Sequence, residues 1–236
     1  MIDKHPDRIG GMFDRIAPAY DMANRVLSLS LDTLWRRRAI RLLAITGGDR
    51  VLDVATGTGD LALRALKTGN CRVWGVDLSE KMLSRAREKM PAEAPLFLIR
   101  GDALIMPFRK ESFDRLMVAF GIRNMADIGT FLDESRRVLK EGGRMAVLEF
   151  SLPRLAPLRW LYLLYFRGVL PLAGGIMSGD FSAYRYLRDS VLEFLAPEAL
   201  AAQMNAKGLA VVTTRSLFFG IAHLLIAEKQ RNEDLV

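Results

Sequence analysis

The chain contains one cysteine and two histidines among its 236 residues. Because a disulfide needs two cysteines, Cys71 forms none within the chain, and we expect it to be a small buried residue in a reducing compartment. His5 and His223 stand near opposite ends of the sequence, and no group of cysteines and histidines has the spacing of metal ligands. The sequence therefore predicts neither an internal disulfide nor a metal site.

Long uninterrupted apolar runs are also missing. The first ten residues are polar and charged, without the apolar core of a signal peptide. The longest apolar stretch, 160–177, is interrupted by Arg167 and contains or adjoins several prolines and glycines. Since a membrane-spanning helix needs roughly 20 nearly uninterrupted apolar residues, we expect no transmembrane segment and a cytoplasmic protein.

The composition is typical of a globular protein, with 50% hydrophobic and 26% charged residues. The net charge of +7 and the pI of about 9.8 suit RNA, an anionic membrane surface, or simply a solvated basic face. The basic residues are scattered and no RNA-binding module is recognisable. We therefore expect no nucleic-acid partner.

Helical and strand patterns alternate along most of the chain. Residues 8–43 show helical spacing of apolar side chains, and we assign 1–46 to a helical N-terminal prelude. Strands are expected at 51–55, 72–76, 96–99, 115–120, 145–150, 210–214 and 221–227. This alternation predicts one doubly wound α/β domain, residues 1–236, whose mostly parallel sheet is covered by helices on both faces.

The alternation stops between residues 152 and 193. This segment is rich in aromatic, aliphatic and arginine residues, and long insertions in compact folds are usually functional or disordered. We predict a cap that faces the substrate. Its composition would equally suit the surface of a bilayer, a buried cap helix or a homodimer interface, and these alternatives stay open.

A glycine turn follows the first predicted strand. Gly57 and Gly59 stand where ligands of doubly wound folds bind and where a Cβ would obstruct them. Asp53, inside the strand, can organise the turn and reach a ligand's ammonium group or the water around it. Asp60 would place negative charge where a dinucleotide needs its pyrophosphate, so S-adenosylmethionine is favoured over a nicotinamide cofactor.

Two further aspartates follow neighbouring strands. Asp77 ends the second strand, where its carboxylate could accept hydrogen bonds from both hydroxyls of a ribose. Asp102 follows the third strand, where its side chain could meet the edge of an adenine. Each alone would be an ordinary helix cap or surface residue, but three aspartates at successive strand ends favour a cofactor site.

Several segments carry a more specific pattern: residues 13–24, the glycine turn, 102–108, 120–124, 147–151 and 184–187. Together they resemble the ubiquinone/menaquinone biosynthesis C-methyltransferases, a family of class I S-adenosylmethionine-dependent methyltransferases. The Phe-Gly-Ile-Arg-Asn segment at 120–124 and the Tyr-Arg-Tyr-Leu segment at 184–187 are closer to this family than the glycine turn is. The resemblance implies a seven-stranded, Rossmann-like sheet whose last strand is antiparallel.

The resemblance also implies cofactor contacts at Thr58, Asp77, Asp102 and Ala103. With their neighbours in the turn and at the strand ends, the predicted cofactor site comprises Asp53, Gly57, Thr58, Gly59, Asp77, Leu78, Asp102, Ala103 and Ala119. The family often has serine where this chain has Ala119, so a side-chain contact to the cofactor is missing or replaced here.

The implied reaction methylates a ring carbon of a reduced polyprenyl naphthoquinone or benzoquinone, with demethylmenaquinol expected first. The carbon ortho to a phenolic hydroxyl becomes more nucleophilic on ionisation, but a phenol has a pKa of about 10, so the site must favour the phenolate. Arg123 and Asn124 are expected to stabilise it, and water to accept the proton, because arginine is a poor base. The structural alternative for Arg123 is an ion pair with Asp127.

Tyr184 and Arg185 from the cap, and Tyr20 from the prelude, are expected to contact the quinol. A methyltransferase acting on another lipid, a small phenol or RNA, or a cofactor-binding regulator without catalysis, would be the alternatives, and the family motifs argue against them. A lipid-soluble quinol predicts an enzyme that is either free in the cytoplasm or bound peripherally to the inner face of the cytoplasmic membrane.

Overall fold

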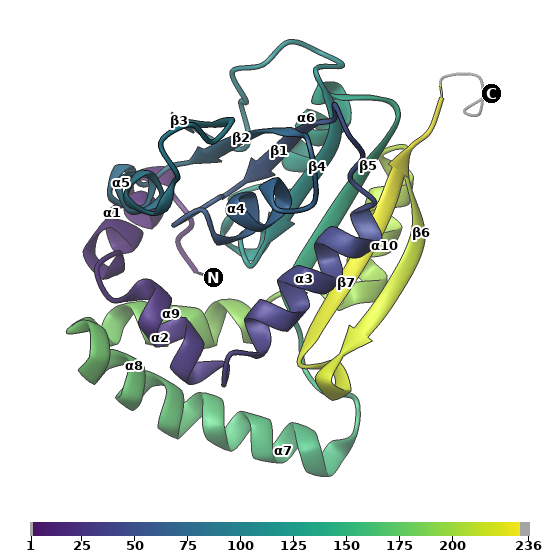
Figure 1. Cartoon of the computed structure of the whole chain (residues 1–236). Helices are drawn as coiled ribbons and strands as arrows, with labels where there is room; N and C mark the ends of the chain where they lie inside the picture. The colour runs from purple at the N-terminus through teal and green to yellow at the C-terminus, as the bar shows by residue number, and fades with distance from the viewer. Residues whose placement is uncertain (1, 232–236) are drawn as a thin grey trace.

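The computed structural model describes residues 2–231, which form a seven-stranded sheet flanked by helices (Figure 1). The strands are β1 (Arg50–Val54), β2 (Arg72–Asp77), β3 (Leu96–Arg100), β4 (Phe113–Ala119), β5 (Leu139–Phe150), β6 (Leu209–Leu217) and β7 (Ala222–Lys229). Their order in the sheet is β3-β2-β1-β4-β5-β7-β6, and β7 is antiparallel to both neighbours while the other pairs are parallel. The predicted doubly wound sheet with an antiparallel last strand is confirmed.

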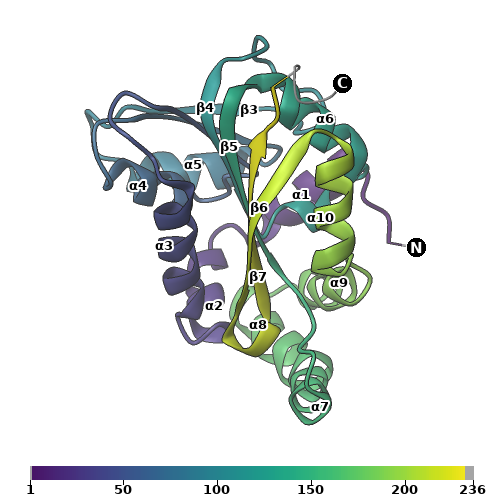
Figure 2. The same cartoon turned by 90° about the vertical axis from the view of Figure 1, so that its right-hand side faces the viewer.

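Helices cover both faces of the sheet (Figure 2). On one face lie α3 (Leu31–Leu43), α4 (Asp60–Leu66) and α5 (Glu80–Lys89), and on the other α6 (Ile128–Val138) and α10 (Pro197–Ala206). Strand side chains alternate between these layers, so Leu52 and Val54 pack with α6 and α10 while Val51 packs with α3 and α4. Cys71 is buried in the second of these layers, as expected.

A further layer of helices lies at the carboxyl ends of the parallel strands. It contains α1 (Pro6–Ile16), α2 (Tyr20–Leu27), α7 (Ala156–Leu164), a π-helical turn (Tyr165–Val169), α8 (Leu170–Ser178) and α9 (Phe181–Leu192). Met12, Ile16, Phe166 and Tyr184 belong to the apolar cluster that holds this layer together. Segments from the start and the middle of the chain therefore pack against each other beside the ends of the strands.

The fifth strand is longer than predicted. The strand was predicted at 145–150, but α6 ends at Val138 and β5 already begins at Leu139. Gly142 has a φ of +68°, and a Cβ on Gly143 would lie 2.7 Å from the carbonyl oxygen of Lys140. Because the register between β4 and β5 shifts here, the glycine pair forms an irregularity at the start of the strand.

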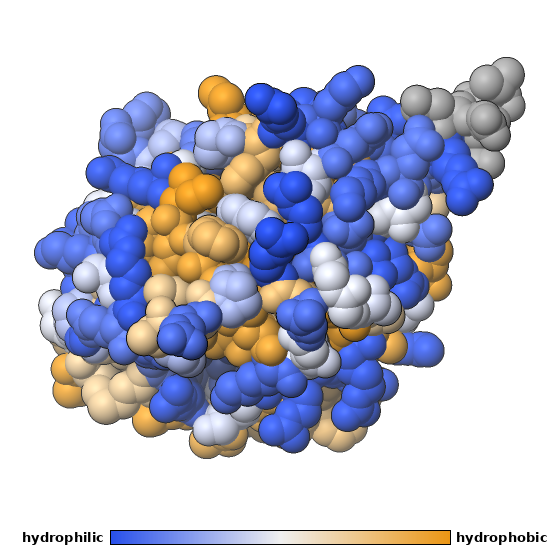
Figure 3. Space-filling view, turned by 45° about the horizontal axis from the view of Figure 1, so that its top comes forward, coloured by the Kyte–Doolittle hydropathy of each residue, from blue (hydrophilic) through white to orange (hydrophobic). Residues whose placement is uncertain are grey.

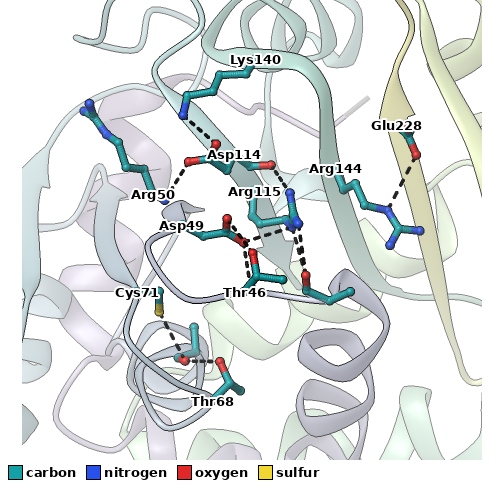
Figure 4. A network of polar contacts seen from close by, with 12 residues as sticks. Thr46, Asp49, Arg50, Thr68, Cys71, Asp114, Arg115, Lys140, Arg144 and Glu228 are labelled. Atoms are coloured by element: carbon teal, nitrogen blue, oxygen red, sulfur yellow. Dashed lines mark hydrogen bonds and ion pairs between the residues drawn. The ribbon is translucent and has the colours of Figure 1, made fainter.

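A polar network joins the strands at their amino ends, opposite the helical layer at their carboxyl ends (Figure 4). Asp114 accepts hydrogen bonds from Lys140 Nζ at 2.6 Å and from the backbone N–H of Arg50 at 2.9 Å. Arg115 Nε lies 3.4 Å from a carboxylate oxygen of Asp49. These contacts link the first residues of β1, β4 and β5, far from the glycine turn at the other strand ends.

The apolar stretch at 160–177 lies in one continuous helix, Ala156–Ser178. In the part of the chain that the structure describes, it is the one helix long and apolar enough to cross a membrane by length and composition. Tyr162, Phe166 and Leu170, four residues apart, are buried against the domain, although only 28% of the most apolar window is buried. The helix therefore lies along the domain with one stripe packed and the rest of its surface exposed.

A π-helical turn carries this helix past its internal proline. Pro171 has no N–H to donate, and in a regular α-helix it would leave a carbonyl unpaired and clash with the preceding turn. The N–H of Leu170 donates instead to the carbonyl of Tyr165, five residues earlier, so the turn just before the proline is wider. The proline is thus accommodated without ending the helix.

The glycines of the helix serve packing. A Cβ on Gly174 would lie 2.2 Å from the ring of Tyr184, and a Cβ on Gly175 would lie 2.2 Å from the ring of Phe181. Both rings come from α9, which packs directly on the backbone of α8. The glycines of this stretch therefore do not end the helix, and they bring two helices close together.

Candidate functional site

The glycine turn joins β1 to α4 beside the carboxyl end of β2. Gly57 and Gly59 have φ angles of +56° and +79°, which favour glycine. A Cβ on Gly57 would meet nothing within 4 Å, whereas one on Gly59 would lie 3.0 Å from the Cβ of Ala86 on α5. Gly57 therefore presents bare backbone to open space, and Gly59 allows two helices to pack closely.

A narrow cleft lies against this turn. It is lined by six of the nine predicted cofactor contacts, namely Gly57, Asp77, Leu78, Asp102, Ala103 and Ala119. The other three, Asp53, Thr58 and Gly59, are not part of its wall. The structure thus brings together the residues at the ends of β2, β3 and β4, as the strand positions predicted.

Asp77 and Asp102 present carboxylates to the cleft. Asp77 accepts hydrogen bonds from the backbone N–H groups of Gly57 at 2.8 Å and Ser79 at 2.9 Å, yet burial raises its pKa to about 6. Asp102 accepts one from the N–H of Leu104 at 2.9 Å. Because each carboxylate oxygen has two lone pairs, both side chains can accept further hydrogen bonds from a ligand.

Asp53 and Thr58 have partners within the protein. Asp53 is buried and accepts a hydrogen bond from Thr56 Oγ1 at 2.7 Å, and burial raises its pKa to about 7. Thr58 Oγ1 donates to Asp21 of α2 at 2.5 Å, and Lys89 Nζ donates to the same carboxylate at 2.8 Å. These residues shape the turn and tie α2 to it, while their direct contact with a cofactor stays a prediction.

The first helix closes the cleft on its outer side. Asp14 of α1 accepts hydrogen bonds from Ser79 Oγ at 2.5 Å and from the N–H of Lys81 at 3.0 Å, at the start of α5. Phe13, from the same helix, and Lys4, just before it, line the cleft. The N-terminal helices therefore contribute part of the wall of the site.

A second cavity opens next to the cleft. Its volume is about 590 Å³, larger than that of the cleft, and its wall is largely apolar and aromatic. The wall comes from α1, α2, α3, the long helix and α9. Phe13, Tyr20 and Phe120 line both spaces, so a ligand in the cleft and a ligand in the cavity would meet at these side chains.

Arg123 lies in the wall of the apolar cavity and its neighbour Asn124 in the wall of the cleft. Arg123 Nη1 donates to Glu149 at 2.8 Å, and both side chains are buried. The alternative ion pair with Asp127 is wrong, because Asp127 caps α6 by accepting a hydrogen bond from the N–H of Thr130 at 2.6 Å. The positive charge of Arg123 is thus balanced by a carboxylate from β5.

The cap contributes tyrosines to the site. Tyr184 lines the apolar cavity, and Tyr186 donates a hydrogen bond to Asn124 Oδ1 at 3.1 Å. Arg185 stands between them on α9, is exposed, and lines neither space. Because successive residues of a helix point about 100° apart, the structure turns Arg185 away from the quinol contact that the sequence predicted for it.

The predicted site residues did not include Glu149, Tyr162 and Tyr186, nor Lys4, Phe13 and Phe120 in the walls of the two spaces. Glu149 and Tyr186 stand inside segments that carried the family resemblance, but their partners lie 26 and 62 residues away, so no local spacing reveals them. Tyr162 lines the apolar cavity, and its buried hydroxyl has no hydrogen-bond partner among the described residues. Such a hydroxyl costs free energy unless a ligand binds it, which makes Tyr162 a candidate contact for a substrate oxygen.

The residues of the cleft suit a nucleoside better than a phosphate. The carboxylates of Asp77 and Asp102 accept hydrogen bonds from hydroxyl and amino groups and repel anions. Leu78 and Ala103 supply apolar surface between them, and the first turn of α4 holds the carboxylate of Asp60, which is paired with Lys89 Nζ at 2.6 Å. A helix N-terminus with an acidic first turn is poorly suited to a pyrophosphate.

Comparison with known proteins agrees with this geometry. The model of the ubiE/COQ5 methyltransferase family matches residues 1–229. The chain belongs to this family. A demethylmenaquinone methyltransferase of Thermus thermophilus is 45% identical over 220 residues, which cover 92% of this chain and 100% of the relative. A ubiquinone/menaquinone biosynthesis C-methyltransferase UbiE of Geobacter sulfurreducens is 43% identical over 228 residues, covering 94% and 89%.

Solved structures of low sequence identity share the fold of this methyltransferase. An S-adenosylmethionine-dependent methyltransferase of Thermotoga maritima has a TM-score of 0.67 at 22% identity, covering 94% of this chain and 99% of its own. One from Aquifex aeolicus has a TM-score of 0.61 at 16% identity, covering 82% and 89%. At these identities the likeness shows the Rossmann-like fold.

Membership of this methyltransferase family implies S-adenosylmethionine as the cofactor, as the sequence predicted. The cleft fits it, because Asp77 can hold ribose hydroxyls, Asp102 can meet the adenine edge, and the backbone at Gly57 leaves room beside them. When bound, the cofactor supplies an electrophilic methyl group on a sulfonium. The direct contact of each residue with it is a prediction that follows from its place in the cleft.

Proposed function

We propose that this methyltransferase converts demethylmenaquinol into menaquinol by methylating a carbon of the quinol ring. One observation carries the proposal: the cofactor cleft meets a far larger apolar cavity at Phe13, Tyr20 and Phe120. A quinol ring at this junction has its reacting carbon beside the cleft and its prenyl tail in apolar surroundings. The names of the relatives from T. thermophilus and G. sulfurreducens support this acceptor.

The reaction transfers one methyl group and releases one proton. The ring carbon ortho to a phenolic hydroxyl attacks the methyl carbon, a carbon–carbon bond forms, and the carbon–sulfur bond breaks with its electron pair going to sulfur. The ring carbon then loses its hydrogen as a proton, which restores aromaticity. Because a phenol has a pKa of about 10 and reacts best when ionised, the site must favour the phenolate.

In this proposal Arg123 and Asn124 favour the phenolate. Asn124 accepts the hydrogen bond of Tyr186 through Oδ1, which leaves its Nδ2 group to donate to a phenolate. Glu149 holds the guanidinium of Arg123 in place. Since arginine is a poor base and Glu149 already accepts from it, a water molecule takes the phenolic proton in this proposal.

The benzoquinol of the ubiquinone pathway is the second acceptor to consider, because the relative from G. sulfurreducens carries both quinones in its name. We place the enzyme in the cytoplasm, peripherally bound at the inner face of the membrane, because both acceptors are lipid-soluble.

The test is methyl transfer from labelled S-adenosylmethionine to demethylmenaquinol and to its benzoquinol counterpart in detergent. Wild type should methylate at least the first. Arg123→Ala should lose about 100-fold or more in rate while still binding the cofactor, and Asp77→Ala should lose cofactor binding. Arg185→Ala, an arginine of the same cap exposed to solvent, is the matched control and should stay active. A wild-type protein that binds the cofactor but methylates neither quinol would refute the proposed acceptor.

A further inference from the structure

Exposed apolar side chains surround the opening of the large cavity. They come from the outer side of the long helix, from the turn between α2 and α3, and from the turn between β6 and β7, which all lie along the lower side of the molecule in Figure 1. We call this region the mouth surface and define it by Leu29, Trp160, Leu164, Leu172, Ile176 and Phe219, which are 54–82% exposed.

On the long helix these residues form one stripe. Trp160, Leu164, Leu172 and Ile176 are separated by multiples of four residues, so they share the face opposite the buried stripe. No acidic residue occurs between positions 152 and 179. An apolar stripe on a helix without acidic residues is typical of a helix that lies in a membrane interface.

The turn between β6 and β7 presents two phenylalanines to the exterior at a conformational cost. Phe218 and Phe219 have φ angles of +43° and +58°, in the left-handed region, and are 48% and 67% exposed. Bulky residues rarely adopt this conformation, and strain of this kind is usually kept at functional sites. Exposing two aromatic rings to water is unfavourable, whereas transferring them into an apolar phase is favourable.

Each segment of the mouth surface also carries an exposed arginine. Arg25 lies before the first turn, Arg159 and Arg167 lie on the long helix, and Arg215 lies before the second turn. None of them forms an ion pair with an acidic residue of the described chain. Four unpaired cations around an apolar surface match anionic lipid headgroups. A two-fold contact with a second copy would instead bring like charges together.

The mouth surface is continuous with the cavity. Leu29, Leu161, Val169 and Phe218 are exposed at the surface and also line the cavity. Whatever covers the surface therefore covers the opening as well. By contrast, Figure 3, which brings the upper side of the molecule forward, shows charged and polar side chains over most of its outer part.

We propose that the mouth surface docks on the leaflet of an anionic bilayer, so that the tail of the acceptor passes between leaflet and cavity without crossing water. The passage of the tail rests on the proposed quinol acceptor, whereas the docking does not. Leu29, Trp160 and Phe219 enter the apolar part of the leaflet, and the four arginines meet its phosphates.

The test measures binding of the whole protein to phosphatidylcholine vesicles with and without about one third phosphatidylglycerol. Trp160→Ser/Phe219→Ser removes two exposed aromatic rings, and Phe97→Ser/Val212→Ser, 47% and 51% exposed elsewhere on the surface, is the matched control. We expect wild type to bind the anionic vesicles at least tenfold more tightly than the neutral ones. The first double variant should lose at least tenfold and the control less than twofold.

Two further measurements separate the outcomes. Arg159→Gln/Arg167→Gln should weaken binding to anionic vesicles about tenfold and leave binding to neutral ones unchanged. The Trp160→Ser/Phe219→Ser variant should methylate a long-tailed quinol in vesicles at least tenfold more slowly than wild type. It should methylate a short-tailed soluble quinol at the wild-type rate. If wild type binds neither kind of vesicle, or if the folded variant binds as wild type does, the docking proposal is overturned.

A sedimentation experiment addresses the second copy. If wild type is a dimer, the variant is a monomer, and neither binds vesicles, the mouth surface is a homodimer interface and the proposal fails. If wild type binds vesicles but methylates no quinol of either length, the proposed function fails and the docking stands.

Discussion

Burial and ligand binding have opposite effects on the pKa of Asp77. Its pKa of about 6 in the free protein reflects burial, which favours the neutral form. Ribose hydroxyls would donate to it and so favour the ionised form. Asp53 also titrates near neutrality, with a pKa of about 7, but lies outside the cleft.

The affinity for S-adenosylmethionine should therefore rise with pH through about 6 and level off above it, because binding releases a proton below that pH. Asp77→Asn should bind about 10–100-fold more weakly, since hydrogen bonds to a charged group contribute roughly 1.5–3 kcal/mol, and its affinity should depend less on pH. Calorimetric titration between pH 5 and 8 measures this. Asp53→Asn is the control that should keep the pH dependence, and a flat wild-type profile would contradict the role of Asp77.

Tyr162 and Tyr165 provide a matched pair on the same helix. The Tyr162 hydroxyl is buried without a partner and burial raises its pKa, whereas the Tyr165 hydroxyl donates to the carbonyl of Leu27 at 2.9 Å. Tyr162→Phe should raise the free energy of unfolding by about 1 kcal/mol but raise KM for the quinol severalfold, while Tyr165→Phe should lower stability by about 1 kcal/mol. Urea unfolding and steady-state kinetics decide, and an unchanged KM for Tyr162→Phe would exclude it as a substrate contact.

Single residues were predictable where position along a strand fixes their place. Asp77 and Asp102 face the cleft because the carboxyl ends of parallel strands meet at one edge. The partner of Arg123 was not predictable. Helical spacing suggested Asp127, whereas the partner in the structure is Glu149, which lies 26 residues away on β5. Local spacing cannot reveal contacts that only the assembled sheet creates.

At the scale of elements, the packing of α8 on α9 depends on the absence of a side chain at Gly174. Gly174→Ala should lower the free energy of unfolding by about 1–3 kcal/mol, because the new Cβ would displace the ring of Tyr184. It should also raise KM for the quinol, since Tyr184 lines the cavity. Gly168→Ala, where a Cβ meets nothing within 4 Å, is the control and should be neutral or slightly stabilising. Equal stability of the two variants in urea would contradict this account.

The long helix and β5 show why elements can be misjudged from sequence. Local preference disfavours glycine and proline within a helix. Here the rings of Tyr184 and Phe181 pack in the space that the missing side chains of Gly174 and Gly175 leave. In the same way, Gly142 allows an irregular start to β5 where local rules predict the end of a helix. The central strands were predicted well because buried strands are apolar throughout, which needs no knowledge of partners.

At the scale of the whole molecule, the two ends of the parallel strands differ in what they hold. The cofactor cleft lies at their carboxyl ends, and the ion pairs of Figure 4 lie at their amino ends. There burial tends to raise the pKa of Asp114, but its hydrogen bonds from Lys140 and Arg50 outweigh this and hold the pKa below its ordinary value. A carboxylate with a depressed pKa in the folded state stabilises the protein above its unfolded pKa of about 3.9.

Asp114→Asn should accordingly lower Tm at pH 7 by a few degrees, for an expected loss of about 1 kcal/mol. The difference from wild type should shrink as pH falls below about 4 and vanish once Asp114 is protonated in both states. Asp133→Asn, which removes a more exposed ion pair with Lys207, is the control and should change Tm less at either pH. Thermal unfolding at several pH values between 7 and 2 measures both, and a difference that stays as large at pH 2 as at pH 7 would contradict the electrostatic explanation.

The position of the N-terminal segment has a practical consequence. Lys4 and Pro6 line the cofactor cleft, whereas the last described residues lie at the far side of the sheet (Figure 1). An affinity tag or a fluorescent protein fused ahead of residue 2 would sit at the entrance of the cleft and compete with the methyl donor for space. A fusion after β7 leaves both the donor and the acceptor free to enter, so labels and surface attachments for studying this enzyme belong at that end.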